Sequence, residues 1–146
     1  MTREEALERI VAVLGDRLVD LQERSTKRIF LVVSPEAVPE ISRLMIDNLQ
    51  ARFQIATGVD SEDAIEVMYH WALDHLGCLI TVRTSLDRDD PKIESIAPFC
   101  PAAEWIEREM WELLGIRFRT HPDMRHLLLS DDWPEGKYPL RRDYQP

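Results

Sequence analysis

Apolar residues in the first third of the chain repeat at helical spacing, then at strand spacing, then at helical spacing again. Over residues 2–14 they recur every three or four positions, which predicts a helix. Residues 17–23 and 28–33 are strand-like and flank a short polar turn, so they predict a hairpin. A second helix is expected from Ser34-Pro35 onward, because serine caps helices and proline suits their first position.

Three strand-like segments follow the second helix. Residues 53–59 and 64–73 alternate with a period of two, and residues 77–82 form a nearly continuous apolar run that is typical of a central strand. The expected order is therefore helix, two strands, helix and three strands. Helices segregated from strands in this way favour an α+β domain of two layers, with the helices on one face of a sheet.

The rest of the chain holds a polar connection, one clear helix and a tail. Residues 84–98 are polar and are expected to lead into a helix over 102–114, which Gly115 ends. Residues 120–146 contain four prolines and no periodicity, so they cannot build a core of their own. We therefore expect an α+β domain over residues 1–119, followed by an extended C-terminal tail.

Two tryptophans stand out in the helix over residues 102–114. Successive residues turn by about 100°, and the alanines and aliphatic residues then fill one stripe that would face the core. Trp105 and Trp111 lie off that stripe, among charged residues. Either the tail of the chain covers them, or they form part of a partner interface, where tryptophan is a frequent anchor.

The charged residues of the same helix are open to several interpretations. Glu107, Glu109 and Glu112 are expected on a polar face, where they are either solvated or paired with arginines of a partner. Arg108 lies four residues from both Glu104 and Glu112, a spacing at which helical ion pairs form. Paired carboxylates also suit acid–base catalysis, but several of them on a polar face argue against it.

Composition and charge exclude some classes of function. A chain of 146 residues with 45% hydrophobic residues fits one globular domain, and its net charge of -9 argues against nucleic-acid binding. The charge is uneven: residues 1–116 hold 12 basic against 22 acidic residues, and residues 117–146 hold 6 against 5. The tail therefore differs from the body. Neither a signal peptide nor a membrane-spanning run is expected, so any membrane would be reached through partners.

Candidate ligands and nucleophiles are sparse. Cys78 and Cys100 form no CxxC pair, and an iron–sulfur cluster usually needs four thiolates. His121 and His126 lie in a proline-containing loop that would hold a metal poorly. No glycine-rich nucleotide loop is present. We therefore expect no metal, no cofactor and no catalytic residue of the chain's own.

Four sequence blocks near the C-terminus carry a family resemblance. They are EREMWELLGI (107–116), HPDMR (121–125), LLLSDDW (127–133) and YPLRRDY (138–144). In this order they resemble the signature of the 30-kDa subunit family of respiratory complex I, the NADH-quinone oxidoreductase, which includes the homologous small subunit of energy-converting membrane hydrogenases. The resemblance is close over roughly residues 98–145 and looser over the body.

The resemblance implies a fold, a location and partners. The fold would have the element order given above, with a mixed sheet. The chain would dock on the hydrogenase-like large subunit (49-kDa type) beside neighbouring cluster-bearing subunits, on the cytoplasmic side of the membrane. Family members hold no flavin, iron–sulfur cluster or nickel of their own. The end of the sequence soon after Tyr144 resembles the short members of the family, which leaves the electron donor open.

The function expected from this resemblance is structural. The alternatives are a free-standing soluble enzyme or a regulatory adaptor that uses the acidic helix 104–112 and His121, and self-association of the isolated chain also stays open. Twelve residues are candidates for the partner interface: Trp105, Glu107, Arg108, Glu109, Trp111, Glu112, His121, Arg125, Trp133, Arg141, Arg142 and Tyr144.

The tail should not be merely flexible, because it contains many large apolar residues. We expect part of it to pack on the chain's own domain, near Trp105 or Trp111, and the rest to be completed by a partner. Arg141 and Arg142 are expected to make charge-assisted contacts, through carboxylates either of the acidic body or of the large subunit.

Overall fold

The structure is a computed structural model that describes all 146 residues. It contains three α-helices and seven strands, and none of the helices combines the length and the apolarity needed to cross a bilayer. The elements are α1 (Arg3–Leu14), β1 (Leu18–Ser25), β2 (Arg28–Val33), α2 (Val38–Asp47), β3 (Arg52–Asp60), β4 (Ala64–Leu73), β5 (Cys78–Asp87), β6 (Lys92–Glu94), α3 (Glu104–Leu114) and β7 (Arg117–Arg119).

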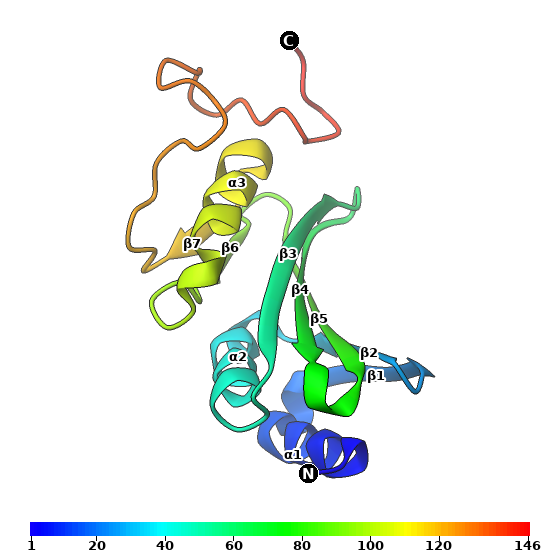
Figure 1. The fold of residues 1–146 in the computed structure, drawn as a ribbon. Coiled ribbons are helices and arrows are strands. Elements are labelled where there is room, and N and C mark those ends of the chain that lie inside the picture. The colour runs from blue at the N-terminus through cyan, green and yellow to red at the C-terminus, as the bar shows by residue number, and fades with distance from the viewer.

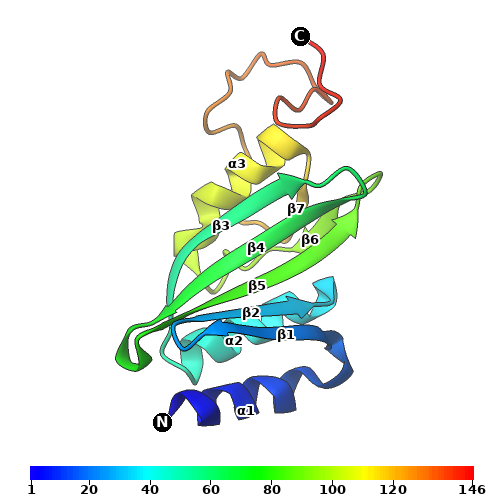
Figure 2. The same cartoon turned by 90° about the vertical axis from the view of Figure 1, so that its right-hand side faces the viewer.

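Five strands form one mixed sheet, in the order β1-β2-β5-β4-β3 (Figure 2). β2 and β5 are parallel, and the other neighbouring pairs are antiparallel. This arrangement confirms the expected α+β fold and its mixed sheet. β5 lies at the centre, as its nearly continuous apolar sequence indicated.

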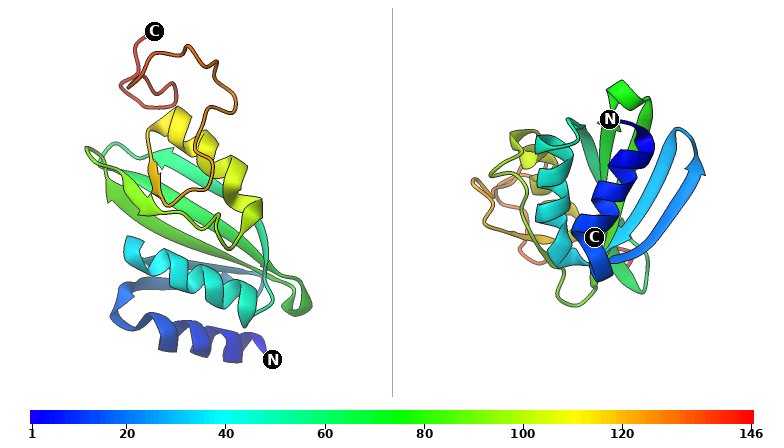
Figure 3. Two further views of the ribbon diagram at one scale, coloured as in Figure 1. Left: turned by 90° about the vertical axis from the view of Figure 1, so that its left-hand side faces the viewer. Right: turned by 90° about the horizontal axis from the view of Figure 1, so that it is seen from below.

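The helices cover one face of this sheet. α2 and α3 lie over it, and α1 lies beside them at the β1–β2 end (Figure 3). Alternate residues of β4 point into this layer, and their side chains Ile65, Val67, Tyr69 and Trp71 are all fully buried. Four residues of the other set, including Met68 and His70, are half-buried on the opposite face, which no helix covers, whereas Ala72 near the strand end is buried. From Ala64 to Trp71 the period of two therefore separates core from surface.

Two details of the strands differ from the expectation. β5 continues to Asp87 instead of ending near residue 82, because Thr84 and Leu86 are also buried and continue the alternation. β6 and β7 were not expected at all, and they pair in parallel with each other outside the main sheet. Each has three residues, too few for a periodic signal.

α3 lies against the edge strand β3 at very short range (Figure 1). Gly58 of β3 makes this approach possible, since a Cβ atom there would lie 2.5 Å from Leu114 Cδ1 and 3.3 Å from Met110. The position of α3, which carries the family-like sequence block, therefore depends on the absence of a side chain at one residue.

We predict that Gly58→Ala destabilises the fold, because the added methyl group overlaps the buried Leu114 side chain, which must then repack together with Met110. The expected loss in free energy of unfolding is about 1–3 kcal/mol, measured by urea denaturation. Gln54→Ala, at an exposed position of the same strand, serves as the control and should change stability by less than about 0.5 kcal/mol. A Gly58→Ala protein as stable as this control would contradict the packing argument.

Candidate functional site

The tail leaves β7 at Thr120 and wraps over the C-terminal end of α3 (Figure 1). It contains no helix or strand, so its backbone N–H and C=O groups need partners outside regular secondary structure. Charged side chains of α3 and of the sheet's loops supply many of those partners, at two places.

The first place is a cradle around the Glu112 carboxylate. It accepts hydrogen bonds from three consecutive backbone N–H groups, those of Leu127 (3.0 Å), Leu128 (2.6 Å) and Leu129 (3.3 Å). The His126 ring adds a fourth contact, with Nδ1 3.0 Å from Oε2. Glu112 is buried, and it occupies the kind of backbone nest in which proteins bind anions.

These contacts set the charge state of Glu112. Burial on its own would raise the pKa of the carboxyl group, but the N–H groups of Leu128 and Leu127, together with His126, outweigh burial and lower that pKa. The carboxylate is therefore ionised at neutral pH, as an acceptor of several hydrogen bonds must be.

Arg108 holds the same stretch of tail from one turn earlier on α3. Its Nε donates to the Arg125 carbonyl at 2.9 Å and its Nη2 to the His126 carbonyl at 2.6 Å. The ion pairs that the spacing of Arg108 from Glu104 and Glu112 would allow do not form, because tail carbonyls take up the guanidinium.

Glu107 faces the other way, toward the loop between β6 and α3. It is fully buried, accepts the Ser95 hydroxyl at 2.6 Å and the Ile96 N–H at 3.2 Å, and lies 4.0 Å from His121 Nε2. His121 is itself occupied, since its Nε2 lies 3.0 Å from the Glu104 carbonyl. Burial raises the pKa of Glu107 to about 7, although the hydrogen bonds from Ser95 and Ile96 oppose that rise.

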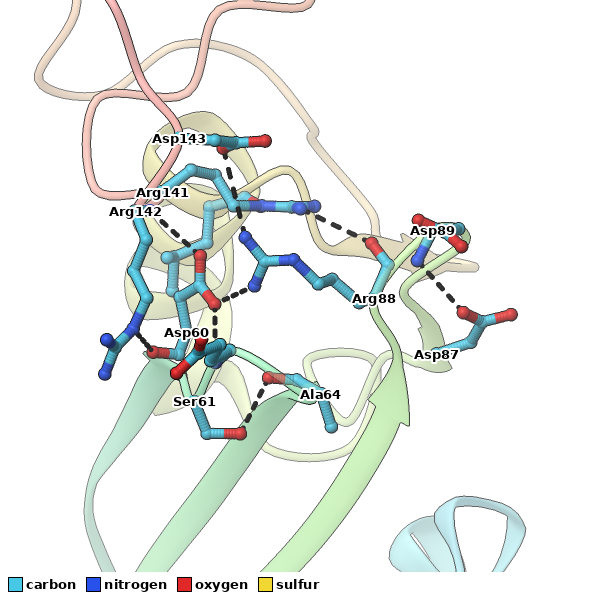
Figure 4. Close-up of polar contacts among 11 residues, drawn as sticks. Asp60, Ser61, Ala64, Asp87, Arg88, Asp89, Arg141, Arg142 and Asp143 are labelled. Atoms are coloured by element: carbon cyan, nitrogen blue, oxygen red, sulfur yellow. Dashed lines mark hydrogen bonds and ion pairs between the residues drawn. The ribbon is translucent and has the colours of Figure 1, made fainter.

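The second place is a clasp that anchors the distal tail, formed by Asp60, Arg88, Arg141 and Arg142 and called the distal clasp below (Figure 4). Buried Asp60 pairs with the Arg88 guanidinium and accepts the Arg142 backbone N–H at 2.9 Å. The Arg142 side chain donates to the Asp60 carbonyl at 2.9 Å. The Arg141 guanidinium donates to the carbonyls of Leu114 and Arg88.

The arginine contacts confirm one part of the expectation and correct another. Arg141 and Arg142 do make charge-assisted hydrogen bonds with the body of the chain. Their guanidinium groups, however, contact backbone carbonyls and no carboxylate. The carboxylate of the clasp serves Arg88, a residue that sequence reasoning did not single out.

The tail covers one of the two tryptophans. Trp111 packs against the His126 ring in a tilted arrangement, with centroids 5.2 Å apart, and is half-buried. Trp105 stays 68% exposed, so packing of the tail near it was the wrong alternative. Further along, Trp133 stacks on Tyr144 and its indole N–H donates to the Lys137 carbonyl.

The candidate residues therefore divide into an inner and an outer group. The inner group has side chains that are buried within the chain: Glu107, Arg108, Glu112 and His121. For Glu107 and Glu112 this rules out the alternative of a solvated polar face. The outer group stays exposed or half-exposed: Trp105, Glu109, Trp111, Arg125, Trp133, Arg141, Arg142 and Tyr144. Sequence reasoning missed Asp60, Arg88 and Ser95, since no local pattern shows that distant backbone groups converge on them.

Comparisons with known proteins converge on one family. The family model described as "Respiratory-chain NADH dehydrogenase, 30 Kd subunit" matches residues 31–146. A subunit of the NADH-quinone oxidoreductase of Chloroherpeton thalassium is 37% identical over 136 residues, which cover 90% of this chain and 56% of that protein. A subunit of the F(420)H(2) dehydrogenase of Methanosarcina mazei is 36% identical over 121 residues, covering 81% of this chain and 76% of the relative.

A solved structure agrees with these sequence matches. A chain of the membrane-bound sulfane sulfur reductase, an archaeal respiratory membrane complex, superposes with a TM-score of 0.79 and 26% identity, over 97% of this chain and 85% of that one. The chain thus spans most of this structural relative, but little more than half of the Chloroherpeton protein.

We predict that Glu112→Gln loosens the tail. The amide presents an NH2 group where a carboxylate oxygen now accepts N–H donors, so charge-assisted hydrogen bonds are lost at a cost of roughly 2 kcal/mol. Amide hydrogen exchange at Leu127–Leu129 should then accelerate by about 30-fold. Glu109→Gln makes the same change on the same helix without a tail contact and should leave these amides protected; equal acceleration in both variants would refute the cradle.

We predict a pH dependence of stability that comes from Glu107. Its folded pKa of about 7 lies above the ordinary value of 4.5, so the folded state binds the proton more tightly. Protonated Glu107 thereby contributes at most about 3 kcal/mol to the free energy of unfolding. This stabilisation is fully present below about pH 4.5 and is lost as the pH rises through about 7.

Glu107→Gln mimics the protonated side chain and should remove this dependence. Urea unfolding of both proteins at about pH 5 and about pH 8 measures this dependence. Between these two pH values the free energy of unfolding of the Gln variant should rise relative to that of the wild type by about 2–3 kcal/mol. The neighbouring titratable groups, Tyr69, Cys100 and His121, are unchanged in the variant. A constant difference between the two proteins across this range would disprove the assignment.

Proposed function

The chain belongs to the family of the 30-kDa subunit of the respiratory-chain NADH dehydrogenase, and from this membership we propose that it is a non-catalytic structural subunit of a membrane-associated redox complex. Its relatives are subunits of NADH-quinone oxidoreductase and F(420)H(2) dehydrogenase. In this proposal the chain docks on the hydrogenase-like large subunit of 49-kDa type, next to cluster-bearing subunits. It reaches the cytoplasmic side of the membrane only through them.

One observation carries the proposal: three of the four charged residues of the family-like block bind groups within the chain. Glu107, Arg108 and Glu112 all bind the chain's own loop or tail. They therefore shape a surface and do not converge on a substrate pocket. Because the tail is already fixed by these contacts, its outer side can meet a partner as a preformed surface.

The enzyme alternative finds little support in the geometry. Among the residues proposed for it, Glu107 and His121 do approach each other, at 4.0 Å. Their side chains are 0% and 1% exposed, so a substrate would have no access to the pair. A structural role accounts for both residues without further assumptions.

Trp105 is the best candidate for the centre of the docking surface. It is 68% exposed on α3, and large exposed aromatic residues are frequent anchors of interfaces. Half-buried Glu109 follows it by one turn on the same helix, and exposed Arg125 lies in the tail that Arg108 holds against α3. The side of the molecule formed by α3 and the tail is the one proposed to face the large subunit (Figure 1).

We predict that Trp105→Ala weakens binding to the co-expressed large subunit by about 30-fold, roughly 2 kcal/mol, while the stability of the isolated chain changes by less than about 0.5 kcal/mol. Affinity is measured with the two purified full-length proteins. The exposed side chain explains both outcomes, since it makes few contacts within the chain.

Val19→Ala is the matched control, because Val19 is equally exposed but lies on the edge strand β1. It should leave the affinity unchanged. A wild-type chain that does not bind the large subunit at all would overturn the proposed function, whereas equal losses for both variants would only move the anchor away from Trp105.

A further inference from the structure

The distal clasp leaves one guanidinium without a carboxylate. The Asp60 carboxylate is shared by Arg88 and the Arg142 N–H. Arg141 donates only from Nε and Nη1, to two backbone carbonyls, and no carboxylate lies within 4.0 Å of it. A guanidinium carries five N–H groups, so the two on Nη2 make no hydrogen bond within the chain.

An open, polar pocket of about 460 Å³ lies beside this guanidinium. Its charged lining consists of Arg88, Lys137 and Arg141 against Asp89 and Asp143. With Asp60, which pairs with Arg88, and Arg142 of the clasp included, four basic side chains stand against three acidic ones, a surplus of one positive charge. Asp143 offers little compensation, since its carboxylate is 77% exposed and lies 4.0 Å from Arg88. The Lys137 side chain makes no hydrogen bond or ion pair; only its backbone is engaged, the N–H by the Pro134 carbonyl and the carbonyl by Trp133.

Repulsion between like charges accompanies this surplus. The pKa of Arg141 is lowered, first by burial and then by the neighbouring Arg88 guanidinium, which together outweigh the opposing effects of Asp143, Tyr138 and Asp89. An anion in the pocket would relieve the repulsion and would supply acceptors for Nη2. A basic pocket on a chain whose net charge is -9 also restricts the orientation in which a partner can dock.

We propose that this pocket receives the carboxylate of an aspartate or glutamate side chain of the partner subunit, bound by the Nη2 group of Arg141 with Lys137 beside it. The inference rests on the proposed function and names the chemistry that one part of the interface recognises. A carboxylate fits better than a phosphate, because a single surplus positive charge matches a monoanion. Asp89 and Asp143 on the rim would repel a dianion.

Figure 4 shows why Arg141 and not Arg142 fills this role. The two side chains leave the tail in different directions, Arg142 toward the Asp60 carbonyl and Arg141 toward the Arg88 carbonyl. Arg141 lines the pocket and Arg142 does not. Replacing Arg141 would break the clasp as well as the pocket. Lys137 is therefore the residue to change, because its side chain contributes charge to the pocket without anchoring the tail.

The first measurement uses the isolated full chain and a small probe, sodium acetate. Side-chain N–H resonances of Arg141 and Arg88 are followed by NMR during titration, with sodium chloride and sodium sulfate at matched ionic strength as comparators. Acetate should shift these resonances in a saturable way, more than chloride or sulfate, and Lys137→Gln should weaken the response. Identical shifts with all three salts, or a stronger response to sulfate, would overturn the carboxylate assignment.

The second measurement tests the occupant in the complex. At low ionic strength, Lys137→Glu should weaken binding of the purified large subunit by about tenfold, and added salt should shrink the effect. Arg9→Glu makes the same change in charge at an exposed position of α1, at the opposite end of the molecule, and should have a much smaller effect.

The outcomes separate the two proposals. Equal effects of Lys137→Glu and Arg9→Glu, with a wild-type chain that binds, would remove the pocket from the interface and leave the proposed function intact. Failure of the wild-type chain to bind would remove the proposed function and the pocket's occupant together.

Discussion

Three consecutive backbone N–H groups of the tail need an acceptor, and the Glu112 carboxylate provides it. A buried N–H group without a partner costs about 1–3 kcal/mol, and this segment has no helix or sheet to supply one. The path of the tail is therefore set from α3, which places the carboxylate. Packing of His126 on Trp111 and the Arg108 contacts depend on the same placement.

Two buried glutamates of α3 show how burial and hydrogen-bond donors together decide the state of a carboxyl group. Glu112 meets three N–H groups and a histidine, and its pKa is lowered. Glu107 meets fewer donors at complete burial, and its pKa rises to about 7. Between them Arg108 binds two tail carbonyls. One short helix thus fixes the loop before it and the tail after it through three polar side chains.

The fold could be predicted from the sequence because periodicity reports burial. The period of two in β4 and the order of the elements were sufficient for the sheet and its helical layer. The site was harder to predict, because a helical wheel places charged residues on the solvent-facing side and so predicts that Glu107 and Glu112 are exposed. Their partners are backbone groups of irregular segments, which the side-chain pattern does not reveal. The strands β6 and β7 were not predicted for a related reason: each buries a single large apolar residue, Ile93 in β6 and Phe118 in β7, which gives no periodic pattern.

The internal contacts of the tail also bear on how a partner would be recognised. A disordered tail would lose conformational entropy when it bound, which lowers affinity. Here the cradle and the distal clasp already hold it, so that loss is incurred on folding and not on docking. The clasp satisfies Asp60 but not Arg141, and the cradle buries Glu112 while Trp105 stays exposed. The contacts that hold the tail on the chain therefore determine which groups, such as the Arg141 guanidinium and Trp105, stay free to contact a partner.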